Sequence, residues 1–228
     1  AFQSNDVRPR WFDARTSLLW PAGGSEKVWT AVGDGHLPQN PLLKSLYPEA
    51  GPALAGAQGL DGQTWRYSLY QWDTTIFADV VKRPEVTADF GWSTEAVVGA
   101  GAWAEKRQLM AENPVFEETL ALSGYQVAIR EGAMTLLGYW QVQQPLQDEG
   151  KIFVHLLDEN GQLVGQHDGL DLAWQWLQPG DAFAQLHVIA LPAELTTGLY
   201  AIQLGVYHTD DGARLPLNVD GTVTDRVL

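Results

Sequence analysis

Residues 151–165, with the sequence KIFVHLLDENGQLVG, decide the fold. From Ile152 to Leu156 every second side chain is apolar, and this is the period of a β-strand. The Asn-Gly pair at 160–161 is the strongest short-range signal for a hairpin turn. Residues 162–165 then supply the return strand, so this part of the chain is predicted to be an antiparallel sheet.

The same pattern continues on both sides of this hairpin. Residues 133–142 place Met134, Leu136, Trp140 and Val142 on one strand face. Further strands are predicted over 182–191, 199–208 and 213–217, separated by turns at 177–181 and 210–212. Short strands with turns about every ten residues indicate an antiparallel β-sandwich, either Ig-like or jelly-roll, over residues 113–228.

The first part of the chain, residues 1–112, is less regular. Strands are predicted over 17–20, 27–32 and 64–72, and 94–110 is a candidate helix. A short helix is expected to begin at Pro41, with Asn40 as its N-cap. This mixture predicts a small α/β-like region that is too small to close its own core and therefore packs on the sandwich.

The charge of the chain changes at the same boundary. Residues 1–112 carry 10 basic and 13 acidic side chains, whereas 113–228 carry 4 and 15. The whole chain of 228 residues has a net charge of −14, which argues against binding to nucleic acid or to anionic membranes. We therefore predict that 113–228 is a separate domain.

Composition excludes several other classes of protein. Cysteine is absent, so disulfide scaffolds, cysteine-ligated zinc and thiol catalysis are excluded. Hydrophobic residues make up 45% of the chain, which is too many for a disordered protein. No run of 18 apolar residues is present, and the chain opens Ala1-Phe2-Gln3 without Met, which suggests an excised fragment of a longer protein.

Two groups of motifs resemble bacterial multi-spanning glycosyltransferases of the dolichyl-phosphate-mannose–protein mannosyltransferase type. The first is residues 10–21, RWFDARTSLLWP, which resemble a segment beyond the last membrane helices of these proteins. The second resembles their C-terminal β-sandwich and comprises 122–125, 138–141, 153–158, 166–168, 176–181, 191–192, 198–200, 205–207 and 212–216.

This resemblance implies a role but no reaction. The acidic catalytic residues of that family lie in loops between membrane helices, which this chain lacks. The chain would be a non-catalytic accessory domain on the extracytoplasmic face of the membrane, binding a neutral glycan or a protein acceptor. The alternatives are a glycan-active hydrolase and a purely structural interaction module.

One stretch is a candidate binding site. Trp174 and Trp176 share one face if their segment is a strand, and Asp171 and His167 lie nearby in the sequence. Aromatic rings beside carboxylates suit sugars, because the rings contact C–H groups and the acids accept hydroxyl donors. The simpler interpretation is that Trp176 is a core residue beside the turn at 179–180. In the binding hypothesis, a bulge or bend at Gln175 leaves Trp174 exposed while Trp176 points inward.

No metal, cofactor or catalytic residue is expected. The histidines at 155, 167, 187 and 208 lack metal-ligand spacing, and the acidic turns at 158–161 and 210–212 supply too few oxygens for calcium. Glu117 and Glu118 would point to opposite faces of a strand, so they cannot flank one glycosidic bond.

Overall fold

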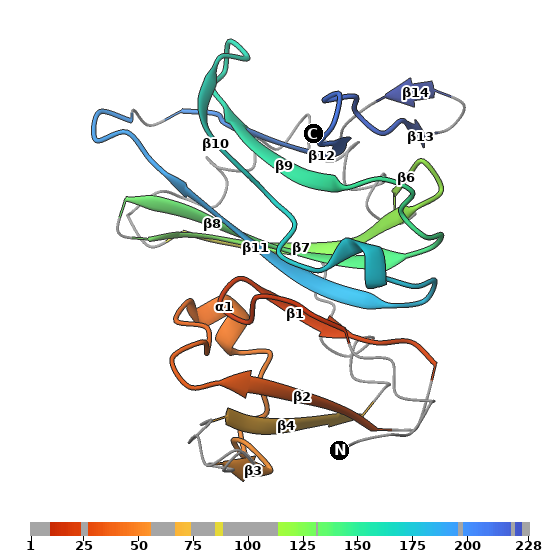
Figure 1. Ribbon diagram of the computed structural model, residues 1–228. Helices are drawn as coiled ribbons and strands as arrows, with labels where there is room; N and C mark the ends of the chain where they lie inside the picture. The colour runs from red at the N-terminus through yellow and green to blue at the C-terminus, as the bar shows by residue number, and fades with distance from the viewer. Residues whose placement is uncertain are drawn as a thin grey trace.

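The computed structural model describes residues 10–23, 27–55, 67–73, 85–88, 114–130, 132–195, 198–219 and 222–224. These residues form a mainly β protein in three layers (Figure 1). The predicted helix at 94–110 lies outside the described residues. Every pairing between named strands is antiparallel except β5 with β7.

The middle layer is an eight-stranded sheet. Its order is β1-β11-β8-β7-β6-β13-β14, with β5 beside β7. The strands are β1 (Ser17–Trp20), β5 (Glu85–Ala88), β6 (Val115–Phe116), β7 (Leu120–Arg130), β8 (Ala133–Val142), β11 (Ala182–Ala190), β13 (Leu217–Val219) and β14 (Thr222–Thr224).

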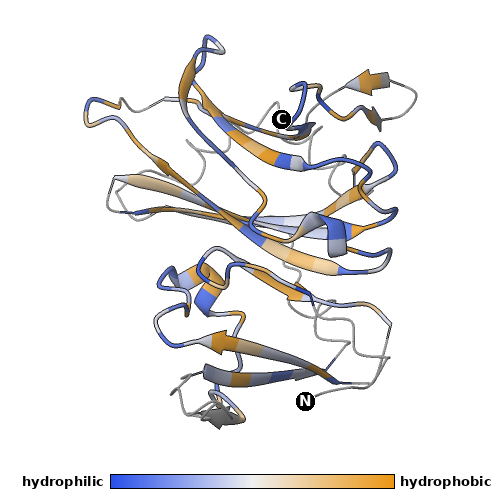
Figure 2. Cartoon of the chain, in the orientation of Figure 1, coloured by the Kyte–Doolittle hydropathy of each residue, from blue (hydrophilic) through white to orange (hydrophobic). Residues whose placement is uncertain are grey.

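A three-stranded sheet covers one face of the middle layer. It has the order β10-β9-β12 and consists of β9 (Gly150–Leu157), β10 (Leu163–Gly169) and β12 (Ala201–His208). The predicted alternation is confirmed, because Ile152, Val154 and Leu156 share one core with Met134 and Leu136 of β8. Two facing sheets around one core are consistent with the predicted β-sandwich. Figure 2 shows apolar colour along much of β9, and hydrophilic colour in the turns and in part of β10.

The opposite face of the middle layer is covered by the first part of the chain. A second three-stranded sheet of order β2-β4-β3 contains β2 (Lys27–Gly33), β3 (Leu54–Ala55) and β4 (Tyr67–Asp73). Beside it lies the helix α1 (Pro41–Lys44), where the backbone N–H of Leu42 donates to Asn40 Oδ1 at 3.0 Å, as the sequence predicted. Leu137, Tyr139 and Leu186 of the middle sheet pack against this region.

Glycine permits one close approach between the two sandwich sheets. A Cβ atom on Gly165 of β10 would lie 2.5 Å from the Ile189 side chain of β11. The register between β9 and β10 also shifts between Leu163 and Gly165. The absence of a side chain at Gly165 therefore lets β10 lie directly against β11.

Three local predictions were wrong. The return strand after the hairpin runs to Gly169 rather than Gly165. Residues 213–217 are mostly a loop, and β13 begins only at Leu217. Glu117 and Glu118 lie in the turn between β6 and β7, with left-handed φ angles of 46° and 57°, instead of in a strand.

Candidate binding cleft

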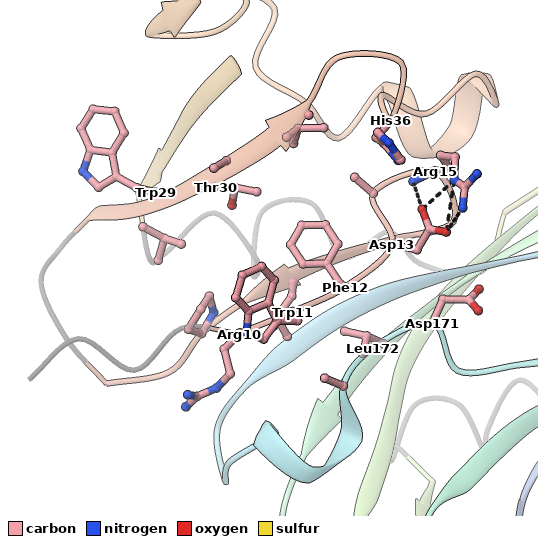
Figure 3. Close-up of a pocket in the computed structure, with 18 of the residues that line it drawn as sticks. Arg10, Trp11, Phe12, Asp13, Arg15, Trp29, Thr30, His36, Asp171 and Leu172 are labelled. Carbon is pink, nitrogen blue, oxygen red and sulfur yellow. Dashed lines mark hydrogen bonds and ion pairs between the residues drawn. The ribbon is translucent and has the colours of Figure 1, made fainter. Parts of the chain in front are cut away.

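A cleft of about 910 Å³ opens between the first part of the chain and the sandwich (Figure 3). Residues 10–15 and 170–173 form one wall, and residues 28–33 of β2 form the other. Leu19, Pro21 and His36 complete the lining. We call this the Trp11 cleft, because the Trp11 side chain lines it and is 65% exposed.

Backbone hydrogen bonds hold the first wall together across the sequence. The N–H of Asp13 donates to the carbonyl of Asp171 at 2.8 Å, and the N–H of Ala173 donates to the carbonyl of Trp11 at 2.9 Å. Phe12 and Leu172 thereby form an antiparallel bridge. Segments 160 positions apart in the sequence thus act as one rigid wall.

A buried ion pair anchors the start of that wall. Arg10 Nε donates to Asp181 Oδ2 at 2.9 Å, and the two side chains are 6% and 0% exposed. The remaining acceptor sites of Asp181 receive the backbone N–H of Ala22 at 2.7 Å and that of Gln178 at 2.9 Å. Because both oxygens of Asp181 accept hydrogen bonds and one of the donors is the Arg10 guanidinium, the cost of burying this carboxylate is well compensated.

A polar group occupies one end of the cleft. Arg15 donates from Nε to both oxygens of Asp13, at 2.9 and 3.2 Å, and its Nη2 also contacts Oδ2. These hydrogen bonds hold the pKa of Asp13 below its usual value. Figure 3 shows Asp13, Arg15 and His36 grouped at this end. Asp13 is therefore an ionised acceptor with its charge already neutralised.

Asp171 is fixed by a second polar network. Its Oδ2 accepts from Gln185 Nε2 at 2.8 Å, and its own N–H donates to Gln185 Oε1 at 2.9 Å. The hydroxyl of Ser17 donates to the Asp171 carbonyl at 3.1 Å. Gln185 and Ser17 are fully buried, so the position of Asp171 is set from beneath the cleft.

Only one of the four predicted site residues lines the cleft, and that residue is Asp171. Trp174 and Trp176 form a short 3-10 helix, η1 (Trp174–Trp176), instead of a strand. Trp174 is half-buried and packs on the sandwich core, whereas Trp176 is 52% exposed. The predicted orientation of the two indoles was therefore the reverse of the one observed.

His167 lies apart from the cleft lining, in β10, and pairs with His187 of β11. Their Nδ1 atoms are 3.1 Å apart, so one ring donates to the other. His187 is fully buried, and its Nε2 has no hydrogen-bond partner among the described residues. Burial, together with the neighbouring His167, lowers the pKa of His187 to about 3, so the ring is neutral. In the described part of the chain, no three His, Cys, Asp or Glu side chains gather as metal ligands.

Sequence reasoning did not identify Trp11, Asp13, Arg15, Trp29 or His36 as site residues. The first three lie within the RWFDAR stretch, which drew attention only through its family resemblance. A further signal was available, because Trp11 belongs to no alternating apolar pattern that would bury it. An indole without a predicted core position is a candidate for a binding surface.

Comparison with known proteins does not assign the chain to a family. No family model matches it, and no curated protein matches it either. Within the described residues, no helix is long and apolar enough to cross a membrane.

Proposed function

We propose that this chain is a non-catalytic accessory module that holds an uncharged acceptor, a glycan or a polypeptide, in the Trp11 cleft. We further propose that it serves a membrane glycosyltransferase-like protein on the extracytoplasmic face. Support for the second part comes from residues 10–21, because the segment that carries the family resemblance also forms a wall of the cleft.

The observation that carries the binding proposal is the exposed Trp11 indole in a large cleft whose arginines are both paired with carboxylates. Among the described residues, two basic side chains, Arg10 and Arg15, and two acidic ones, Asp13 and Asp171, line it. Arg10 is committed to Asp181 and Arg15 to Asp13. Such a lining favours an uncharged ligand that contacts the indole and hydrogen-bonds to the rim.

The alternative of a glycan hydrolase is less well supported. Asp13 and Asp171 both line the cleft beside Trp11, as a hydrolase would require. A general acid needs a carboxyl group whose pKa is raised, however, and the pKa of Asp13 moves in the opposite direction. Oδ2 of Asp171 is already occupied, because it accepts a hydrogen bond from Gln185 Nε2 at 2.8 Å. The pair is therefore better suited to accepting hydroxyl or N–H donors than to proton transfer.

The test uses glycan and peptide arrays with the whole chain. We expect binding to uncharged members of at least one array and a loss of about fivefold or more in Trp11→Ala, as expected for one aromatic contact. Trp176→Ala is the matched control, because Trp176 is similarly exposed but outside the cleft lining. Absence of binding on both arrays, or equal binding by Trp11→Ala, would overturn the proposal.

A further inference from the structure

The wall formed by β2 presents the edge of the strand to the cleft. Six consecutive residues, 28–33, line it. A strand that exposes one face contributes alternate residues, because successive side chains point to opposite sides. An unbroken run means that residues from both faces of β2 border the cleft, as they do when the cleft lies at the edge of the strand.

The burial pattern of β2 agrees with this arrangement. Thr30 and Val32 point into the protein and are buried, whereas Trp29 and Ala31 are exposed. Figure 3 shows the Trp29 indole directed away from Trp11 and Phe12 on the opposite wall. Residues from both faces of β2 therefore belong to the cleft lining.

Within the described residues, β4 is the one strand that pairs with β2, and the Gly33 carbonyl at the end of β2 also accepts from the N–H of His36 at 3.0 Å. In an antiparallel pair, each strand directs about half of its N–H and C=O groups to the partner and half to the other edge. As far as the described residues show, the other edge of β2 thus offers donors and acceptors over residues 28–32, which is a template for another strand.

We propose that the Trp11 cleft binds an extended, uncharged peptide that adds to the edge of β2 as a new strand. This inference rests on the proposed function, since it names the ligand of the same cleft. Residues 28–32 span roughly 17 Å, so the paired part of the peptide is of similar length. Main-chain hydrogen bonds supply affinity, and side chains at alternate positions supply specificity.

The lining indicates the chemistry of that peptide. Both arginines of the described lining are already paired, Arg10 with Asp181 and Arg15 with Asp13, so an acidic peptide residue would find no unpaired cation there. Asp171 already accepts a hydrogen bond from Gln185. Trp11 and Phe12 face β2 across the cleft, and they offer apolar contacts to every second side chain of the peptide. A neutral segment that alternates apolar and small polar residues fits best.

The decisive probe is backbone N-methylation of a peptide that binds. Methyl groups at alternate positions remove donors from one edge of the peptide and leave the other edge intact. We expect methylation of one alternate set to weaken binding at least about tenfold and methylation of the other set to have a small effect. Equal binding by the unmethylated peptide and by both methylated peptides would overturn strand addition.

Amide hydrogen exchange provides an independent readout in the unmodified protein. Bound peptide is expected to protect alternate amides of β2, the set that faces the cleft, with little change in β4. If glycans bind in a Trp11-dependent manner without this protection, the strand inference fails while the proposed function stands. If neither peptides nor glycans bind, both fail.

Discussion

At the scale of single residues, Asp181 holds the first wall of the cleft in place. Asp181→Asn keeps the size of the side chain but leaves the Arg10 guanidinium buried without its counter-charge. We expect a loss of about 3–5 kcal/mol in the free energy of unfolding, measured with urea. Asp13→Asn is the matched control, since its partner Arg15 is 59% exposed and an exposed pair contributes under about 1 kcal/mol. Similar losses in both variants would contradict this account of Asp181.

His187 predicts how stability depends on pH. The folded protein does not protonate this ring until about pH 3, whereas the unfolded chain does so near pH 6.5. The unfolded state therefore binds more protons between these values, so stability falls as the pH is lowered through this window, by up to about 1.4 kcal/mol per pH unit. The free energy of unfolding, measured with urea at several pH values between 7 and 4, should fall less steeply with decreasing pH in His187→Gln and His187→Leu than in the unchanged protein. An unchanged slope in both variants would show that His187 titrates normally.

These residues also show where sequence reasoning fails at this scale. The buried partners Arg10 and Asp181 are 171 positions apart, and Ser17 and Asp171 are 154 apart. No local pattern encodes such pairs, because their chemistry appears only when the chain is folded. Asp171 was found because it lies beside a tryptophan-rich stretch, although neither of those tryptophans lines the cleft.

At the scale of elements, the two tryptophans of η1 differ in burial in the opposite sense to the prediction, because Trp174 is the more buried of the two. Trp174→Ala should cost about 2 kcal/mol, because the half-buried indole packs on the sandwich core. Trp176→Ala should cost under about 1 kcal/mol, because 52% of its side chain is exposed. Thermal or urea unfolding of the two variants decides the point, and a larger loss in Trp176→Ala would contradict the burial of the two indoles in η1.

The turn between β6 and β7 stores backbone strain. Glu118 has a φ of 57°, a region that glycine occupies at little cost. We expect Glu118→Gly to raise the free energy of unfolding by about 0.5–1 kcal/mol. Glu159→Gly is the matched control in the turn after β9, where the backbone is not left-handed, and it should lower stability slightly. Destabilisation by both substitutions would show that the Glu118 side chain makes a compensating contact.

Strands were easier to predict than this turn or η1. Alternating apolar residues identify β8, β9 and β12, because one face of each strand is buried in the core. The pattern Trp-Gln-Trp fits a strand and a 3-10 turn equally well over three residues. Which strands pair could not be predicted from the sequence either. β1 pairs with β11, which lies far away in the sequence, whereas β2 pairs with β4.

At the scale of the whole molecule, the charge boundary and the packing make different predictions. The shift in charge near residue 113 predicts that residues 113–228 fold alone. In the structure, however, the outer face of the middle sheet buries Leu137, Tyr139 and Leu186 against the first part of the chain. The first part also supplies β1, which pairs with half of β11. A change in charge along the chain reflects the composition of the protein surface. It does not show which apolar sheet face is buried against another segment.

We therefore expect the fragment 113–228 to lack a cooperative unfolding transition. Its outer sheet face would be exposed to water, Asp181 would lose Arg10, and the β11 edge would lose its partner strand. The fragment should bind a hydrophobic dye and show a broad urea transition, while its far-ultraviolet circular dichroism remains that of a β protein. Supplying residues 1–112 as a separate chain should restore the cooperative transition if packing across this face is the cause. A sharp transition in the isolated fragment would instead show that the two facing sheets and their shared core are sufficient for cooperative folding. Residues 113–228 would then be a domain that folds without the first part of the chain.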